Sequence, residues 1–302
     1  MFRSVLRGAA PAIATAACCT VALAVPLAAP LAAPLAAQSP DPIATISLAS
    51  YSPGTTILTM QASVNGHEGT FMFDTGEGVS MISPDMAQKI GCKPWGNITG
   101  FRMRGDRIDS PHCDNITFEL AGQSFAAPTA IVFDIMKFFP PNQPRLAGSI
   151  GLDLFAGRAI TFEYSEQTIV VESPGSFATR IAHATEIPIR IVRDAEGVAL
   201  TVDVGVPTRD GTAWMELDSG GGTAFIIANH IAPLLGLDST SKARQSVSFT
   251  IAGKIPVTAP ARTMSQMIMD GNINVPFLEK WDVTLDLAAG RAWVTPSGSG
   301  TH

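Results

Sequence analysis

Apolar and polar side chains alternate along the chain from residue 56 onward, which is the pattern of β-strands with one buried face. Asn65-Gly66 follows the first of these segments. This dipeptide is typical of two-residue hairpin turns because both positions tolerate positive φ. A return strand is then predicted over residues 70–73. The pattern therefore predicts a β-hairpin that ends at an acidic residue, Asp74.

An apolar strand that runs into an Asp-[Thr/Ser]-Gly turn occurs twice. Residues 71–76 read Phe-Met-Phe-Asp-Thr-Gly, and a short helix is predicted over residues 83–90, capped by Ser83 and with a proline in its first turn. Residues 214–220 read Trp-Met-Glu-Leu-Asp-Ser-Gly, and a helical segment is predicted over residues 228–235. A lone Asp-Thr-Gly is usually an ordinary loop turn, but two at matching positions indicate a repeat.

The ends of the two halves also match. Residues 147–155 align with residues 270–278, and residues 160–164 align with residues 283–287 with no gap. A duplication in which both copies keep the strand and the Asp turn is far more specific than either tripeptide alone. The chain is therefore predicted to be all-β, with two β-rich halves around a shared seam.

The first 37 residues have the features of a signal peptide. Arg3 and Arg7 precede a long uncharged apolar run, and small residues lead up to Ala37. An uncleaved membrane anchor is the alternative, which three prolines disfavour because they would break a helix already too short to span comfortably. The other predicted units are a first lobe (38–172), a linker (173–185), a second lobe (186–296) and a flexible tail (297–302).

Composition argues against several classes of partner. The chain has 302 residues and a formal net charge of −6, which argues against nucleic acid or an anionic membrane surface. Its five histidines are scattered and no Cys/His spacing suits zinc, so no metal or cofactor is expected. After signal removal we expect a periplasmic or secreted protein without stable membrane insertion.

Two cysteines remain after the signal peptide, Cys92 and Cys113. In an oxidising compartment such a pair is a candidate disulfide. It would close a loop of about 20 residues, for which chain entropy predicts roughly 3 kcal/mol of stabilisation. Two unpaired buried thiols are the alternative.

The two Asp turns carry a definite chemistry if folding brings them together. Two carboxyls about 3 Å apart share one proton, because both cannot ionise easily in a poorly solvated site. The ionised member, Asp74 or Asp218, can take a proton from water while the other donates to a substrate carbonyl. Thr75 and Ser219 can hydrogen-bond across the seam. The glycines that follow them, Gly76 and Gly220, let backbone N–H groups approach the carboxylates.

On these motifs the chain resembles the bacterial retropepsin-like, pepsin-related aspartic protease family in its single-chain, two-lobed form. The resemblance covers residues 56–296 and includes the later Ser149-Ile150-Gly151 element. It implies two β-barrel lobes related by a pseudo-two-fold axis, with short helices after each Asp turn and a substrate cleft covered by a flap. It also implies that Asp74 and Asp218 hydrolyse peptide bonds of a peptide or protein substrate, and that a monomer suffices for a complete site.

Two additional acids depart from the family pattern. Glu216 lies two residues before Asp218 and therefore on the same strand face, where the first copy has Met72. A buried extra carboxylate is costly unless it is paired, so Glu216 either meets an arginine or marks an altered site. Glu77 follows the first turn directly and is expected to raise the pKa of Asp74.

Two further departures concern the backbone and the flap. Asn274 stands where the first copy has Gly151, and asparagine is the next best residue for a left-handed backbone. The flap of the family usually places an aromatic residue over the catalytic pair. Within residues 96–105 the aromatic candidate is Phe101.

The predicted function is that of an aspartic endopeptidase. The alternative is a secreted peptide-binding or scaffold protein that keeps the cleft but does not cut, with Glu216 or Glu77 impairing the pair. A serine hydrolase is disfavoured because Ser219 has no glycine two residues before it, as a nucleophile elbow requires.

Overall fold

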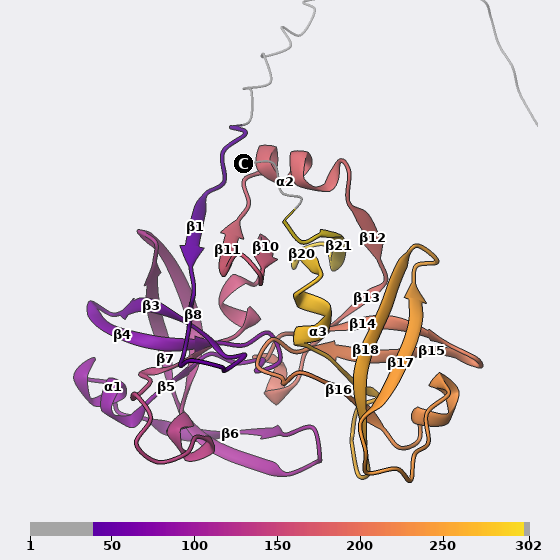
Figure 1. The fold of residues 1–302 in the computed structure, drawn as a ribbon. Coiled ribbons are helices and arrows are strands. Elements are labelled where there is room, and N and C mark those ends of the chain that lie inside the picture. The colour runs from indigo at the N-terminus through magenta and orange to yellow at the C-terminus, as the bar shows by residue number, and fades with distance from the viewer. Residues whose placement is uncertain (1–38, 299–302) are drawn as a thin grey trace, which may run out of the picture. The chain divides into compact units, whose positions relative to one another are not determined.

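The computed structural model describes residues 39–298, so the expected signal peptide and the last residues of the expected tail lie outside the described part. Three sheets of six, seven and eight strands make up this part of the chain (Figure 1). The eight-stranded sheet belongs to the first half, the seven-stranded sheet to the second, and the six-stranded sheet to both. No helix among residues 39–298 is long and apolar enough to cross a membrane.

The eight-stranded sheet has the order β2-β3-β4-β9-β5-β8-β7-β6, with an additional pairing between β3 and β7 that curls it toward a barrel. The predicted hairpin is confirmed: Asn65 and Gly66 have φ of 44° and 85°, and Val64 pairs with His67. The strands of this sheet are β2 (Ala49–Ser50), β3 (Leu58–Val64), β4 (His67–Phe73), β5 (Met81–Ile82), β6 (Trp95–Phe101), β7 (Arg107–Leu120), β8 (Gln123–Val132) and β9 (Gly148–Ile150).

The seven-stranded sheet has the order β13-β14-β15-β19-β16-β18-β17. Its strands are β13 (Ile189–Val192), β14 (Thr201–Thr208), β15 (Gly211–Leu217), β16 (Phe225–Ala228), β17 (Gln245–Ile251), β18 (Ile255–Met264) and β19 (Gly271–Ile273). The run β15-β19-β16-β18 has the same sequence of parallel, antiparallel and parallel pairings as β4-β9-β5-β8. The sequence repeat is therefore also a repeat of topology, and the predicted bilobal fold class is confirmed.

The six-stranded sheet joins the two halves in the order β1-β11-β10-β20-β21-β12. At its centre β10 pairs antiparallel with β20, and Thr161 lies opposite Thr284 with their hydroxyl oxygens 3.0 Å apart. These two threonines are equivalent in the sequence repeat, so the pairing itself has local two-fold symmetry. The strands are β1 (Ala44–Ser47), β10 (Ala159–Glu163), β11 (Thr168–Val171), β12 (Thr185–Ile187), β20 (Trp281–Asp286) and β21 (Arg291–Pro296).

The core of the first half is built around aromatic rings directly behind the first Asp turn. Phe73 makes edge-to-face contacts with Phe155 and Phe162, at centroid distances of 6.4 and 5.2 Å, and is almost fully buried. Such contacts add to the burial of apolar area. The residue before Asp74 is therefore anchored in the core, which limits the freedom of the turn.

The helices are short, and only the first of the two predicted ones forms an α-helix over nearly its whole predicted length. Helix α1 (Pro84–Lys89) is capped by the Ser83 hydroxyl, which accepts from the Met86 amide. In the second half β16 continues to Ala228, and only a 3-10 turn, η4 (Ala232–Leu235), follows. The helical segment predicted over residues 228–235 is therefore confirmed only for its last four residues, as a 3-10 helix. The β-branched residues before this segment favour a strand, and Pro233 can occupy only the first turn of a helix.

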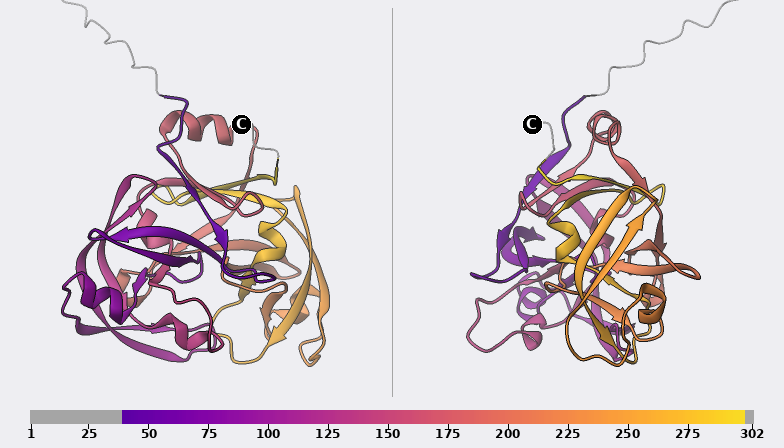
Figure 2. Two further views of the ribbon diagram at one scale, coloured as in Figure 1. Left: turned by 60° about the vertical axis from the view of Figure 1, so that its left-hand side comes forward. Right: turned by 45° about the vertical axis from the view of Figure 1, so that its right-hand side comes forward.

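The predicted linker contains a helix, α2 (Pro174–Ile181), which begins with a capping box between Ser173 and Ser176. It lies above the six-stranded sheet, on the side away from the other two sheets (Figures 1 and 2). Its Phe177 ring contacts the Trp293 ring of β21, with the ring centroids 5.4 Å apart. The other helical segments are α3 (Val275–Leu278), η1 (Ile135–Phe138), η2 (Leu152–Phe155) and η3 (Ala195–Gly197).

The pattern of apolar and polar residues predicts no strand over residues 92–109, where the resemblance to the family implies the flap. β6 and the first part of β7 form a hairpin instead, from Trp95 paired with His112 to Phe101 paired with Arg107. Six of the seven residues of β6 are exposed or half-buried, and Ile98 is the one that packs in an apolar cluster. A strand of this kind lacks the apolar alternation that reveals a strand in sequence.

Candidate active site

The two Asp turns lie at equivalent strand ends. β4 ends at Phe73, and the Asp74 amide donates to the Ile150 carbonyl of β9 at 3.1 Å. β15 ends at Leu217, and the Asp218 amide donates to the Ile273 carbonyl of β19 at 2.9 Å. In both lobes a parallel neighbour strand thus holds the backbone of the aspartate.

The hydroxyls of Thr75 and Ser219 lock the two turns together across the seam. The Thr75 amide donates to Ser219 Oγ at 3.0 Å, and the Ser219 amide donates to Thr75 Oγ1 at 2.9 Å. Thr75 Oγ1 in turn donates to the Leu217 carbonyl at 2.6 Å. Both side chains are buried, so each bond forms away from water. The structure brings together the residues expected to brace the pair.

Backbone N–H groups of both turns converge on Asp74. The Gly76 and Gly220 amides donate to Asp74 Oδ1 at 2.8 and 3.0 Å. A Cβ added at Gly220 would lie 2.2 Å from Asp74 Oδ2, and one at Gly76 would lie 3.1 Å from Asp218 Cγ. Glycine is therefore required at Gly220 for close approach rather than for an unusual backbone angle.

Asp74 and Asp218 line the same cleft and act on each other: Asp218 lowers the pKa of Asp74, and repulsion from Asp74 raises the pKa of Asp218. Two carboxyls in such proximity can share one proton. Burial is the largest cause that raises the pKa of Asp218, and with repulsion from Asp74 it brings that pKa to about 7. Burial also raises the pKa of Asp74, but the two glycine N–H groups and Asp218 oppose this effect. These contacts favour an ionised Asp74 beside a protonated Asp218.

Asn272 is a site residue that the sequence analysis missed. Its Nδ2 donates to Asp218 Oδ2 at 2.5 Å, and its Oδ1 accepts from the Ile226 amide at 3.0 Å. Asn272 is fully buried and is the repeat equivalent of Ser149. The sequence offered one signal for this role: Ser149 and Asn272 are both polar, and they stand at matching positions of two otherwise apolar strands.

Ser149 serves a different acid, because its hydroxyl donates to Glu77 Oε1. The pKa of Asp74 is raised, as expected, but Glu77 is not among the causes of this shift. Burial is the largest cause of the raised pKa of Asp74, whereas burial and repulsion from Asp74 raise the pKa of Glu77 well above its usual range. Glu77 Oε2 is buried and has no hydrogen-bond partner among the described residues.

Glu216 lies on the cleft face, as its position two residues before Asp218 predicted. Its pKa is raised well above the usual range by burial first, and then by repulsion from Asp218, Asp74 and Asp203. Arg190 lies opposite Asp203 in the sheet and over the Trp214 ring at 3.8 Å, and it lowers the pKa of Asp203, not of Glu216. Of the two alternatives for Glu216, an arginine partner and an altered site, the described residues favour the second.

Asn274 does not need a left-handed backbone, contrary to the sequence prediction. Its φ is −129°, and the φ of the equivalent Gly151 is −99°. The Asn274 side chain instead donates to the Ala224 carbonyl at 2.8 Å and fixes the loop after the second Asp turn.

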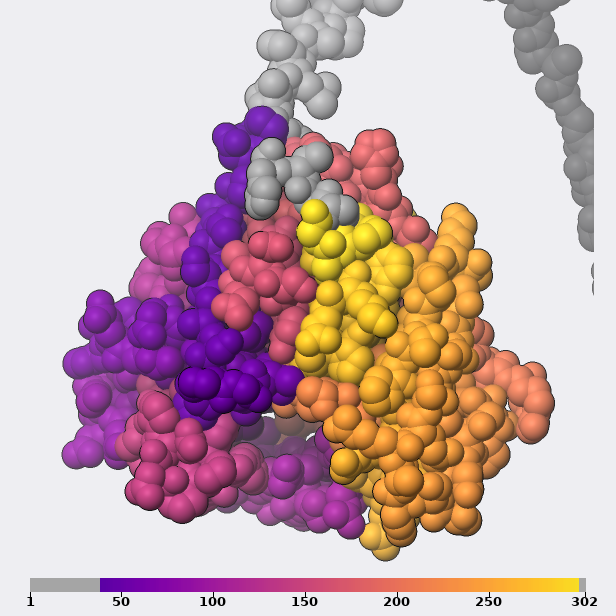
Figure 3. Space-filling model, viewed as in Figure 1, coloured from indigo at the N-terminus to yellow at the C-terminus, as the bar shows by residue number. Residues whose placement is uncertain are grey.

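A cleft of about 380 Å³ contains both aspartates. Figure 3 shows an opening between the purple-to-pink first half and the orange second half. Within residues 39–298, no group of three or more His, Cys, Asp or Glu residues is placed to hold a metal ion. The residues that line it include Met72, Met81, Phe101, Arg102, Phe138, Glu216 and Met269.

Phe101 lies at the end of β6, lines this cleft and is half exposed. The hairpin that carries it continues to the other lobe, where the Ile268 amide donates to the Met103 carbonyl at 3.0 Å. Nearer its base, Ile98 packs with Ala195 and Ala199 of the second half. The β6–β7 hairpin therefore bridges the cleft, which is the position of a flap.

Cys92 and Cys113 form a disulfide, with their Cα atoms 6.3 Å apart. The prediction of a bond is confirmed, and the alternative of two free thiols is wrong. The bond ties the segment that follows α1 to β7, the strand that returns from the flap.

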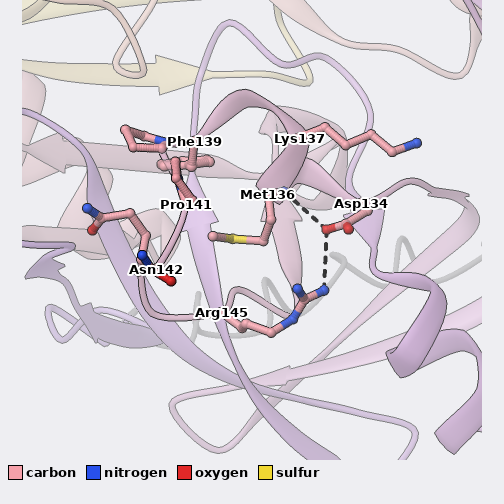
Figure 4. A pocket seen from close by; sticks show the side chains of 9 residues that line it. Asp134, Met136, Lys137, Phe139, Pro141, Asn142 and Arg145 are labelled. Carbon is pink, nitrogen blue, oxygen red and sulfur yellow. Dashed lines mark hydrogen bonds and ion pairs between the residues drawn. The ribbon is translucent and has the colours of Figure 1, made fainter.

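A second hollow of about 270 Å³ lies on the loop around η1 and contains neither Asp74 nor Asp218 (Figure 4). There Asp134 accepts from the Met136 amide at 3.2 Å and pairs with Arg145 at 3.5 Å. The contacts of Asp134 are thus local, and its carboxyl caps η1.

Comparisons with known proteins agree with this architecture. Residues 60–154 match the model of the aspartyl protease family. A basic 7S globulin from soybean has a TM-score of 0.55 at 8% identity, over 83% of this chain and 94% of its own. Conglutin gamma, a basic 7S globulin from lupine seeds, has a TM-score of 0.54 at 8% identity, over 86% and 96%. A search of curated sequences found no match.

The family match covers the first Asp turn, its hairpin and the flap, and the similarity of fold covers most of the chain. The second Asp turn, outside the matched residues, is related to the first by the repeat of topology and meets it across the seam. Residues 60–154 are therefore similar to the aspartyl protease family, and they lie within a two-lobed aspartic-protease-like fold that covers most of the chain.

Proposed function

We propose that this protein is an aspartic endopeptidase that hydrolyses peptide bonds with a water activated by Asp74 and Asp218. The observation that carries the proposal is the meeting of these two carboxyls in one cleft, on turns braced by Thr75 and Ser219. A shared proton provides a base and an acid at one place, which amide hydrolysis needs.

In this mechanism the ionised Asp74 takes a proton from a water bound between the carboxyls, and the oxygen attacks the peptide carbonyl. Asp218 gives its proton to the carbonyl oxygen, which yields a neutral tetrahedral diol. Collapse of the diol breaks the C–N bond. The proton held by Asp74 then passes to the leaving amine, and a hydroxyl proton of the diol returns to Asp218. No covalent enzyme intermediate forms, and protons balance over the cycle.

The N–H groups of Gly76 and Gly220 suit Asp74 to the role of base because they stabilise its ionised form. The flap hairpin suits the site to an extended peptide, because Phe101 and Met269 line the cleft from opposite lobes. Both lobes come from one chain, so a monomer contains the complete site. The disulfide supports a periplasmic or secreted location.

The proposal is tested with Asp74→Asn and Asp218→Asn, each assayed on a broad peptide library from pH 3 to 7. Loss of cutting in both variants, with Asp41→Asn as an exposed control that keeps activity, is the expected result. Cutting that continues unchanged in Asp74→Asn would remove this residue from the mechanism.

A peptide-binding protein without catalysis is the second candidate. It is favoured by Glu77 and Glu216, which crowd the pair with additional acids. The two similar solved structures are basic 7S globulins, from soybean and from lupine seeds. A pepstatin-type transition-state mimic separates the candidates, because tight binding needs a correctly protonated pair. An intact library and no binding of the mimic would favour the second.

A further inference from the structure

The two lobes place different residues at the same position beside the catalytic pair. Met72 and Glu216 each lie two residues before an aspartate on equivalent strands, and both line the cleft. Side chains two apart on a strand share a face, so each flanks its own aspartate. The pseudo-two-fold axis between the lobes therefore puts Met72 and Glu216 on opposite sides of the pair.

The neighbouring strands extend this difference across each sheet. In the first lobe, the residues that pair with one another across adjacent strands beside Met72 carry no charge. They are Thr59, Met72, Ser149 and Met81. In the second lobe the equivalent set of paired residues contains two neighbouring acids, Asp203 and Glu216. The other members are Asn272 and Ile226. Directly opposed like charges destabilise a sheet, so a cation that binds here would stabilise the two acids in their ionised form.

The described residues do not supply that cation to Glu216. Arg190, which lies opposite Asp203, is stacked on Trp214 and acts on Asp203. The cleft lining contains five acids and a single cation, Arg102, whose guanidinium lies 4.5 Å from the Phe138 ring centroid. A cleft with this balance of charge attracts cationic groups.

We propose that the Glu216 side of the cleft binds a lysine or arginine side chain of the substrate, and that the Met72 side binds a large apolar one. This inference rests on the proposed peptidase function and names its substrate class. An ammonium or guanidinium group would give the Glu216 carboxylate a charge-assisted hydrogen bond, which burial strengthens. On the other side Met72 packs with Ile135 and Leu146, an apolar cluster without a charge.

The first test is a peptide-library digest whose cleavage sites are sequenced. Wild-type protein is expected to cut between a large apolar residue and a lysine or arginine. Glu216→Gln, of nearly the same size, and Glu216→Met, which installs the residue of the first lobe, are expected to lower the selectivity for the basic residue over its neutral isostere by roughly ten-fold or more. Glu68→Gln, at an exposed position of the first hairpin, is the matched control and should keep the preference.

The second test does not depend on cutting. Two statine-type peptides that differ only by lysine or norleucine on the expected side are titrated calorimetrically into wild-type protein and Glu216→Gln. Tighter binding of the lysine peptide by roughly ten-fold, lost in the variant, supports the inference. Equal affinities for the two peptides, no binding of either, or a preference that persists in both Glu216 variants would overturn it.

These outcomes separate the inference from the proposed function. A lysine preference in binding that depends on Glu216, without cutting of any peptide, would sustain the cationic subsite and reject the peptidase. Cutting that needs Asp74 but shows no preference for a basic residue would sustain the peptidase and reject the cationic subsite.

Discussion

The Gly220 amide of the second lobe donates to Asp74 Oδ1 of the first lobe at 3.0 Å, so each lobe contributes to the environment of the same carboxylate. The contact is possible only without a side chain, because a Cβ at Gly220 would lie 2.2 Å from Asp74 Oδ2. The position of the base thus depends on how the second turn approaches the first.

Gly220→Ala is expected to displace Asp74 and to lower kcat/KM by at least about 100-fold, since small misplacements in a catalytic geometry cost that much. Gly222→Ala is the matched control, because nothing lies within 4 Å of a Cβ there. Steady-state cleavage of one good peptide by both variants measures the difference. Equal activity of the two would mean that Asp74 is not held by this contact.

Thr75→Val tests the cross-lobe brace. It keeps the shape of the side chain but leaves the buried Ser219 amide without its acceptor, so a loss of about 1–3 kcal/mol in the free energy of unfolding is expected. Urea unfolding measures this loss. Thr212→Val, at an exposed position of β15, is the control and should change stability by less than about 0.5 kcal/mol. A loss of similar size in both variants would argue against the brace.

The parts of the fold that sequence analysis could predict are those with strong local or repeated patterns. Asn65-Gly66 predicts its hairpin from backbone preference alone. The two Asp turns predict one site because the repeat puts them at equivalent places. Glu216 is placed on the cleft face by strand period. In each case the determining interactions lie within a few residues or recur in the second copy.

The parts that sequence analysis missed depend on partners far away in the chain. The flap hairpin lacks an apolar face, and its tip is held by Ile268 of the other lobe. Asn272 is polar within a buried strand because Asp218 needs a donor, which only the assembled site reveals. The disulfide was left as one of two alternatives because the distance between Cys92 and Cys113 depends on the path of β7.

The pH dependence of catalysis follows from the pair. Asp218 must hold the proton, and its pKa is raised to about 7, so the alkaline limb of kcat/KM is expected near pH 7. Cleavage should therefore persist from mildly acidic pH to near neutrality and fall above it. Asn272→Ala removes a hydrogen bond that lowers this pKa, so the limb should move to higher pH. The pH profile of one peptide in both proteins measures the shift, and an unmoved limb would contradict the assignment.

Asp282 gives a separate pH dependence of stability. It is 2% exposed, and burial first, then repulsion from Glu163, raises its pKa from 3.8 to about 6. A carboxyl whose pKa is raised by folding holds its proton more tightly in the folded state. Its contribution to the free energy of unfolding is therefore fully present below pH 3.8 and is lost as the pH rises through 6. Asp282→Asn is therefore expected to be more stable than wild type at pH 7, by at most about 3 kcal/mol, but not at pH 3.5. Urea unfolding at both values measures this, and an equal difference at the two pH values would refute it.

The disulfide joins the return strand of the flap to the segment that follows α1, so its removal tests whether the flap needs this anchor. The bond closes a loop with a sequence separation of 21 residues. Chain entropy then predicts a loss of roughly 3 kcal/mol in the free energy of unfolding for Cys92→Ala/Cys113→Ala.

Cleavage at 25 °C should change less than stability in this double variant. β7 remains paired with β8 from His112 to Leu120, and the flap tip remains bonded to the second lobe through Met103 and Ile268. We expect kcat/KM within about three-fold of wild type, beside a fall in Tm of more than about 5 °C. A large loss of kcat/KM in a variant that is still folded at 25 °C would show instead that the disulfide positions the flap over the pair.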